Sequence, residues 1–261
     1  MIGGPRGAGR GAAAGFSETA ENYAHSMAPS LRTMAVRVVQ RAQLGVGERI
    51  LDVGTGTGIG AAAALSSGRE VIGVDAAPGM LAIARREVPG ARFVEADFAA
   101  LPFPANSFHV VISVHALHFA EDPAAVLAEW RRVTTAGGRL SLSVPGPRSA
   151  LSMPIFEPIY RRHGMRRKIL VPTRRKLSTW ARAAGWQQVK VIADPDTTIR
   201  LAGPESFAIW MRTGTRTEAS RSLSPERYAA LEADLLAATP IGHDGLLHIP
   251  FGTLYLTARN L

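Results

Sequence analysis

Short apolar runs alternate with longer stretches of helical spacing from Arg49 to Val144. The helical stretch after Asp122 and Pro123 shows the period well, because Val126, Leu127, Trp130 and Val133 fall on one face. We expect this helix to end at Gly137 and Gly138, and another to run over 80–88 behind Pro78. The apolar runs predict strands at 49–53, 70–74, 92–95, 108–114 and 139–144. This alternation predicts an α/β fold with a doubly wound parallel sheet.

The pattern is less regular after Pro145. Helices are predicted at 176–184, 204–213 and 225–238, and strands at 188–193 and 252–258. The chain has no internal repeat and no linker long enough to separate two domains. We therefore expect one domain over 16–261, behind a flexible tail at 1–15 that is rich in Gly, Ala and Arg.

Composition excludes several classes of protein. The 261 residues are 46% hydrophobic and 20% charged, which excludes wholesale disorder. No run approaches the ~18 apolar residues of a membrane span. The absence of cysteine excludes disulfides and thiolate metal sites, and no metal-ligand spacing such as H-E-x-x-H occurs, so no metal is expected. Without an apolar h-region near the N-terminus, we expect a cytoplasmic protein.

Positive charge is concentrated in one segment. The chain carries 30 Lys and Arg against 21 Asp and Glu, a net charge of +9. Between Ile159 and Ala193 there is no acidic residue. The ten basic residues there are Arg161, Arg162, Arg166, Arg167, Lys168, Arg174, Arg175, Lys176, Arg182 and Lys190. This segment predicts a solvated basic face, or a surface for an anionic substrate, partner or membrane.

A glycine-rich loop follows the first strand, in the sequence ILDVGTGTG. Gly54, Gly56 and Gly58 let the backbone approach a ligand closely, and the next helix offers free N–H groups at its start. Since Gly56, Gly58 and Ala61 also satisfy G-x-G-x-x-A, the loop alone is compatible with a dinucleotide.

Three acids at successive strand ends narrow the choice of ligand. Asp52 ends the first strand, where a carboxylate would repel pyrophosphate and suit a cationic amino-acid group. Asp75 ends the second strand, where it can accept both hydroxyls of a ribose, and Asp97 follows the third, near an adenine amino group. Together they predict a site for a nucleoside that carries an amino-acid tail.

Four segments in this order resemble the class I S-adenosylmethionine-dependent methyltransferases, in particular the ubiquinone/menaquinone-biosynthesis C-methyltransferase-like group. They are ILDVGTGTG, VIGVDAAPGML, VEADFAALPF and SFHVVISVHALHFAEDPAAVLAEWRRVTTAGGRL, within a match from about Phe16 to Val144. The sequence departs from the family at His109, where an acid is usual, and at 134–136, where Lys-Pro is common. These two departures bear on the subfamily to which the sequence would belong, and not on the class of reaction.

The resemblance implies a Rossmann-like sheet of seven strands with the last strand antiparallel. It implies S-adenosylmethionine as the cofactor, bound by the half of the chain over 45–145, and a substrate-shaping half over 146–261. The implied cofactor contacts are Tyr23, Asp52, Gly54, Gly56, Gly58, Asp75, Ala76, Met80, Asp97, Phe98, Ser113 and Val114.

The implied reaction is methyl transfer to a carbon, oxygen or nitrogen atom of a small molecule. A lid made of an N-terminal helix over 16–41 and a helical insertion over 151–172 would cover the substrate. His115 and His118 follow the fourth strand and are the candidate catalytic bases, with pocket lining as the alternative.

Two other functions fit part of the pattern. The G-x-G-x-x-A match suits an NAD(P)-dependent oxidoreductase. The basic segment 161–190 suits a nucleic-acid-modifying methyltransferase, although no Asn-Pro-Pro-Tyr motif follows the fourth strand. The sequence leaves open the acceptor atom, the substrate and the oligomeric state.

Overall fold

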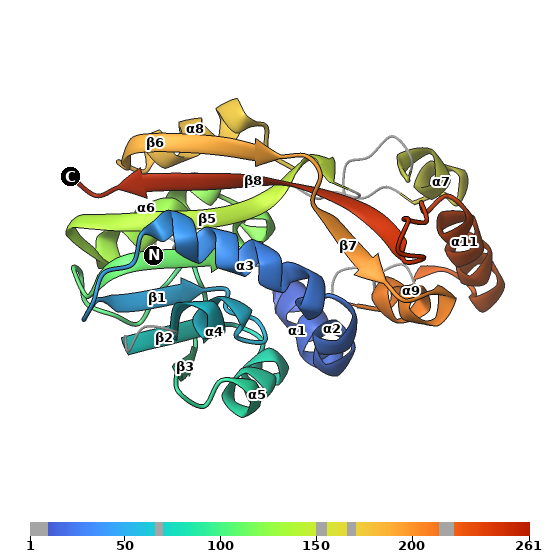
Figure 1. The fold of residues 1–261 in the computed structure, drawn as a ribbon, viewed down its shortest axis with the longest axis horizontal. Coiled ribbons are helices and arrows are strands. Elements are labelled where there is room, and N and C mark those ends of the chain that lie inside the picture. The colour runs from blue at the N-terminus through green and yellow to red at the C-terminus, as the bar shows by residue number, and fades with distance from the viewer. Residues whose placement is uncertain (1–9, 66–69, 150–155, 166–170, 214–221) are drawn as a thin grey trace, which may run out of the picture.

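The computed structural model describes residues 10–65, 70–149, 156–165, 171–213 and 222–261. One mixed sheet runs through the molecule in the strand order β3-β2-β1-β4-β5-β8-β6 (Figure 1). Its first five strands are parallel: β1 (Arg49–Val53), β2 (Glu70–Asp75), β3 (Arg92–Glu95), β4 (Phe108–Val114) and β5 (Thr134–Ser149). The predicted doubly wound sheet is confirmed.

Strand β8 (Leu247–Arg259) runs antiparallel between β5 and β6 (Gln187–Asp194), so the prediction of an antiparallel last strand is confirmed. The strand order contains the seven strands that were expected, and the described residues add an eighth strand beside that order. The extra strand is β7 (Thr198–Leu201), which pairs with the first residues of β8. β8 begins five residues before the predicted start at Gly252, and this extension is where β7 pairs.

Helices cover both faces of the sheet. α3 (Ala28–Ala42), α4 (Ile59–Leu65) and α5 (Pro78–Glu87) pack on one face. α6 (Pro123–Val133) and α8 (Arg174–Ala183) pack on the other, around the buried side chains of Trp130 and Trp186. Both indole N–H groups donate to backbone carbonyls at 2.9 Å, so this core buries them without loss of hydrogen bonds.

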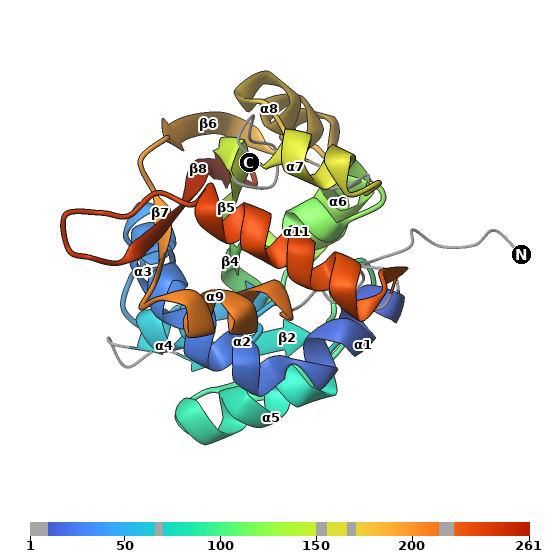
Figure 2. The same ribbon diagram turned by 90° about the vertical axis from the view of Figure 1, so that its right-hand side faces the viewer.

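A second group of elements lies beyond the carboxyl ends of the parallel strands, the end that faces the viewer in Figure 2. It comprises α1 (Arg10–Glu18), α2 (Ala20–Ser26), the 3-10 helix η1 (Leu117–Phe119), α7 (Glu157–Arg162), α9 (Pro204–Met211) and α11 (Pro225–Ala237). Helices α7, α9 and α11 contribute to an apolar cluster with Leu31, Phe207, Trp210 and Leu231, and Phe16 of α1 packs against a separate small cluster with Met80. This end of the molecule covers the edge where the glycine loop lies.

The N-terminal segment differs from its prediction. Residues 1–9 lie outside the described residues, and helix α1 already begins at Arg10, so the flexible tail does not extend to residue 15. The single lid helix expected over 16–41 is divided among α1, α2 and α3. Pro29 explains the second break, because it lacks the N–H that a helix continuing from α2 would need. In the expected insertion over 151–172, α7 is the helix that the structure describes.

Helix α6 ends at Val133, four residues before the predicted stop at Gly137. The carbonyls of Arg132 and Val133 accept the backbone N–H groups of Asn106 and Ser107, at 3.0 and 2.9 Å. Thr134 pairs with Phe108 in the sheet and thereby starts β5. Pairing with the segment before β4 therefore ends the helix, and the glycines lie within the strand.

None of the helices within the described ranges is both long and apolar enough to cross a membrane. The cytoplasmic location stays a prediction.

Candidate active site

The glycine loop turns sharply at the carboxyl end of β1. Gly54 and Gly56 have φ of +68° and +54°, a region in which side chains other than glycine are strained. A Cβ atom on Gly54 would lie 2.3 Å from the Cβ of Ala116, just beyond β4. The backbone N–H of Thr55 donates to the carbonyl of Val74 at 2.9 Å. The loop is thereby held between the ends of β2 and β4.

A cavity of about 80 Å³ lies at this edge, between the glycine loop, the ends of β2 and β4, and helices α1, α2 and α5. It is lined by Ala13, Phe16, Tyr23, Gly54, Gly56, Asp75, Ala76, Met80, Phe98, Val114, His115, Ala116 and Phe119. Eight of the twelve residues proposed from the sequence as cofactor contacts are therefore brought together at one cavity, with His115 beside them. Their roles stay predictions.

Asp75 is fixed at the end of β2 by the backbone around it. One carboxylate oxygen accepts the N–H of Gly56 and the other accepts the N–H of Ala77, each at 2.9 Å. Burial raises the pKa of Asp75, and the two backbone N–H groups oppose that shift. The carboxylate thus has a defined orientation in the cavity wall.

Asp52 lies outside the cavity lining, and its predicted contact with an amino-acid group stays a prediction. Its side chain is only 1% exposed, and it is not among the residues that line the cavity. One of its oxygens accepts the hydroxyl of Thr55 at 2.6 Å, and burial raises the pKa of Asp52 to about 6. A Cβ atom on Gly60 would lie 2.6 Å from a carboxylate oxygen of Asp52. Asp52 therefore packs beneath the loop and supports it.

Three other proposed contacts also lie outside the cavity lining. Asp97 is exposed and accepts the backbone N–H of Ala99 at 2.8 Å. Ser113 is buried and donates to the carbonyl of Val53 at 2.8 Å. Gly58 lines a different hollow, between α3, α4 and α5. Their cofactor contacts stay predictions that the cavity does not support.

The two histidines after β4 are buried, and they differ in position. His115 lines the cavity in the left-handed region at φ +53°, with its Nε2 3.4 Å from the hydroxyl oxygen of Thr253. His118 packs its ring against Phe119, with the centroids 3.9 Å apart, and does not line the cavity. In both rings Nδ1 has no hydrogen-bond partner among the described residues.

Burial keeps both imidazoles neutral at physiological pH. It lowers the pKa of His118 to about 3, and burial together with the neighbouring His118 lowers the pKa of His115 well below its usual range. A base with so low a pKa removes a proton poorly near neutrality. The lowered pKa values therefore favour a role for His115 as a hydrogen-bonding group, and they do not favour either residue as a general base.

Sequence reasoning missed four residues around the cavity. Phe16 of α1 lies edge-on against Tyr23 and Phe119, with centroids 5.9 and 5.3 Å apart, and these rings close one side of the cavity. Phe119, within the segment HALHFA, was detectable as an aromatic residue just after a strand. Thr253 and Phe251 contact His115 from β8. No local pattern marks them, because they follow His115 by more than 130 residues.

Within the ranges that the structure describes, no three His, Asp or Glu side chains come together in an arrangement suited to a metal ion.

Comparison with known proteins finds methyltransferases. Residues 51–142 match the family described as a methyltransferase domain. The chain is 33% identical over 170 residues to demethylmenaquinone methyltransferase of Clavibacter sepedonicus, and the match covers 64% of this chain and 64% of that protein. It is 40% identical over 139 residues to the malonyl-[acyl-carrier protein] O-methyltransferase of Halorhodospira halophila, over 51% of this chain and 47% of that protein. The matches thus span about half to two thirds of these curated relatives.

Among solved structures, the [4+2]-cyclase SpnF is similar in fold, with a TM-score of 0.57 and 23% identity over 87% of this chain and 80% of that one. Proteins of this fold are thus described by more than one activity, so the site and not the fold has to carry the functional argument.

Proposed function

We propose that this chain, whose residues 51–142 match a methyltransferase-domain family, transfers a methyl group from S-adenosylmethionine to a small-molecule acceptor. The observation that carries this proposal is the position of Asp75, whose oriented carboxylate meets the glycine loop at one cavity. A carboxylate at this strand end suits the hydroxyls of an unphosphorylated ribose, a group that S-adenosylmethionine and NAD share. The family matches favour S-adenosylmethionine and a methyltransferase over NAD and an oxidoreductase.

The lining fits the parts of this cofactor. Asp75 would accept the ribose hydroxyls, while Met80 and Phe98 supply apolar walls for the base. A Cβ atom built on Gly56 would meet no atom outside the loop within 4 Å, so the loop leaves room for the ligand at this position. Tyr23 and the backbone at Gly54 would flank the amino-acid end. When bound, the cofactor supplies an electrophilic methyl group on its sulfonium sulfur.

The cavity is smaller than the cofactor requires. Its volume of about 80 Å³ compares with roughly 300–1,000 Å³ for ligand pockets. Phe16, Tyr23 and Phe119 close it on the side of α1. We infer that α1 moves outward to admit the cofactor and then covers it, which also keeps water from the reacting atoms.

We propose that His115 positions the acceptor. The hydroxyl of Thr253 can donate to the carbonyl of Phe251, 3.1 Å away, and its oxygen can then accept the Nε2–H of His115. This tautomer leaves Nδ1 as a hydrogen-bond acceptor without a partner among the described residues. It would accept a hydroxyl or amine proton of the substrate and hold the reacting atom in line with the methyl group.

The acceptor is proposed as a small molecule with an apolar part. The named activities of the relatives include a demethylmenaquinone and a malonyl-acyl-carrier-protein methyltransferase, which supports an aromatic quinol or a carboxylate as acceptor. The apolar cluster with Met27, Phe207 and Trp210 lies beside Tyr23 of the cavity wall and supports the first type. The excess of basic residues in the chain supports an anionic group on the acceptor as well.

The experiment has two stages. In a thermal-shift titration, S-adenosylmethionine should stabilise the full chain, by about 2.7 kcal/mol at 100 times its dissociation constant, while NAD and NADP should not. Mass spectrometry should then detect methyl transfer from deuterium-labelled cofactor to demethylated quinols or to carboxylic acids. Stabilisation by NAD alone would contradict the proposal, and cofactor binding without transfer to any acceptor would indicate another activity on this fold.

A further inference from the structure

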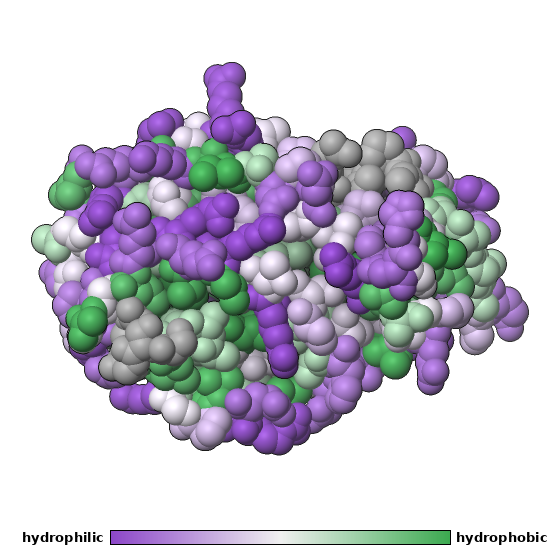
Figure 3. All heavy atoms as spheres, in the orientation of Figure 1, coloured by the Kyte–Doolittle hydropathy of each residue, from purple (hydrophilic) through white to green (hydrophobic). Residues whose placement is uncertain are grey.

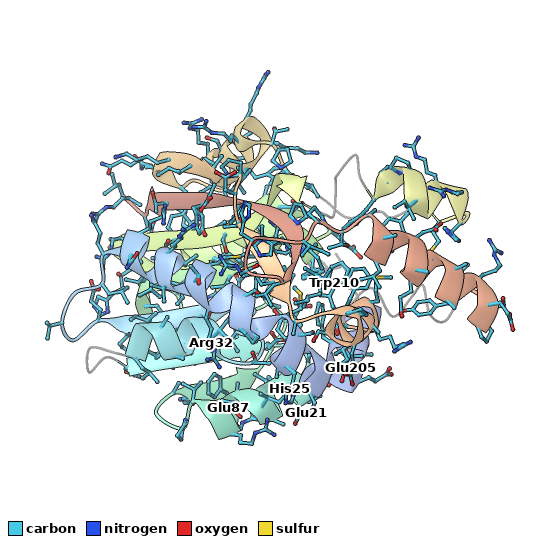
Figure 4. All side chains as sticks on the ribbon, turned by 45° about the vertical axis from the view of Figure 1, so that its right-hand side comes forward. Glu21, His25, Arg32, Glu87, Glu205 and Trp210 are labelled. Atoms are coloured by element: carbon cyan, nitrogen blue, oxygen red, sulfur yellow. The ribbon has the colours of Figure 1, made fainter. Side chains whose placement is uncertain are left out.

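A second hollow lies on the other side of the glycine loop, between helices α2, α3, α4 and α5. It measures about 430 Å³, several times the cavity described above. In Figure 4, the side chains of His25, Arg32 and Glu87 lie around this α3–α5 hollow, each from a different helix. Its size falls in the range of small-molecule pockets, roughly 300–1,000 Å³.

The walls of the α3–α5 hollow are apolar. Ala28 and Val36 contribute from α3, Ile59 and Ala62 from α4, and Ile83 from α5. Alanines keep the space between the three helices open, because longer side chains at these positions would fill it. Val36 is 44% exposed and extends this apolar lining to the surface.

A buried hydroxyl without a partner lies in the lining. Thr57, in the glycine loop, is only 5% exposed, and its Oγ1 forms no hydrogen bond within the described part of the chain. Buried polar atoms in folded proteins nearly always have a partner. The unpartnered hydroxyl of Thr57 is thus an observation, independent of the hollow's shape, that points to a ligand.

Of the two arginines that line the rim, one has no carboxylate partner within the described part of the chain. Arg86 is already held by Glu21 and Glu87, at 2.9 and 3.0 Å. Arg32 is exposed and forms no ion pair with any residue that the structure describes. His25 lies beside it, with Nδ1 2.7 Å from the carbonyl oxygen of Glu21. In formal charge the two arginines balance Glu21 and Glu87, and Arg32 is the one whose guanidinium has no bonded carboxylate among the described residues.

We propose that the α3–α5 hollow is a second small-molecule site, distinct from the cofactor cavity, for a ligand with an apolar body and one anionic group. The apolar body packs against Ile59, Ala62 and Ile83, and the anion meets Arg32. A polar atom of the ligand pairs with Thr57. Gly56 lines the cofactor cavity and Thr57 lines this hollow, so the two sites lie on opposite sides of one loop. The site does not depend on the proposed methyl transfer.

Octanoate and 1-octanol are suitable probes, since they share an alkyl chain and differ in the anionic group. Methyl NMR of the full chain without cofactor should show saturable shifts of Ile59 and Ile83 with octanoate, and weaker binding of octanol. Replacement of Arg32 by Gln should weaken octanoate binding about fivefold and leave octanol unchanged. The matched control is Arg92→Gln, which removes the same charge from an exposed position on β3.

A second pair of variants keeps the test decisive. Ala62→Leu fills the hollow from an exposed position, so the fold is retained while octanoate binding falls at least tenfold. Ala230→Leu makes the same change on the exposed face of α11 and should have no effect. Octanoate that binds equally well to the Ala62→Leu and Arg32→Gln proteins, or that shifts neither isoleucine, would overturn the proposal. Because no cofactor is present, this result is independent of methyl transfer.

Discussion

At the residue scale, we expect cofactor binding to depend most on the side chain of Asp75. We expect Asp75→Ala to raise the dissociation constant of S-adenosylmethionine at least tenfold, because hydrogen bonds to a charged acceptor contribute about 1.5–3 kcal/mol each. Calorimetry measures the change. Asp75→Asn is the matched variant, since its amide oxygen can still accept the N–H of Gly56. An unchanged dissociation constant in the Ala variant would remove Asp75 from the site.

Asp52 determines a pH dependence of stability. Its folded-state pKa of about 6 lies above the unfolded value of about 3.9, so the folded protein holds this proton more tightly. The free energy of unfolding should therefore fall by about 3 kcal/mol as the pH rises from about 4 through 6. Asp52→Asn should remove this slope in urea titrations at several pH values.

The control for Asp52 is Asp196→Asn, at an exposed carboxyl. It should leave the slope as in the parent protein. A parent protein whose stability rises between pH 4 and 6, by an amount that Asp52→Asn abolishes, would show that the carboxylate form is the stabilising one.

The neutral histidines give a prediction about kinetics. We expect His118→Asn to lower the single-turnover rate less than tenfold, because a base with a pKa of about 3 contributes little near neutrality. His115→Asn should cost more, since His115 lines the cavity and contacts Thr253. A drop of ~10²–10⁴-fold for His118→Asn, with cofactor affinity retained, would instead identify His118 as the general base.

At the element scale, we expect α1 to control access to the cavity. Its Phe16 contacts Tyr23 and Phe119, and the Ser17 hydroxyl oxygen accepts the N–H of Gly79 at 2.7 Å. These contacts attach α1 to α2, η1 and α5, so they have to open together before a ligand can enter.

We expect Phe16→Ala to raise the association rate of S-adenosylmethionine about fivefold, because an aromatic pair contributes about 0.5–1.5 kcal/mol beyond its buried area. Stopped-flow fluorescence measures the rate. Phe16→Leu keeps an apolar contact and should lie between the two proteins. An association rate that is the same in all three would mean that α1 does not limit entry.

At the scale of the whole molecule, the basic segment is dispersed. Arg161 and Arg162 lie on α7, in ion pairs with Glu157 and Asp234, while other members lie on α8 and β6, away from α7 in Figure 1. Arg166, Arg167 and Lys168 lie outside the described residues. In Figure 3, hydrophilic side chains gather over α3, β8 and β6. There Arg41, Arg139, Lys190 and Arg259 line a hollow of about 180 Å³.

The basic residues of this segment that the structure describes lie on three separate elements, α7, α8 and β6, and this dispersal does not favour contact with one phosphate backbone. We expect weak binding to RNA and to duplex DNA, without methyl incorporation, when fluorescence anisotropy is measured between ~50 and ~200 mM salt. Binding that falls about a thousandfold across this range, as six phosphate contacts require, would contradict the small-molecule function. It should then also be lost when Arg166, Arg167 and Lys168 are replaced by Gln.

The sequence determined the features that depend on neighbours along the chain. The parallel strands, the glycine turn, and the positions of Asp75 and Met80 at the cavity follow from local apolar patterning and from the glycine spacing. Parallel strands bring their carboxyl ends to one edge, so residues at those ends converge whatever the connecting helices do.

Only the tertiary structure decided which of the converging side chains reach the cavity. Asp52 ends a strand as Asp75 does, yet packing beneath Gly60 and Thr55 buries it. The contact of Thr253 with His115, the strand β7 and the α3–α5 hollow arise where segments far apart in the chain meet. Such contacts depend on the shapes of packed side chains, and the period of apolar residues along the chain contains no information about them.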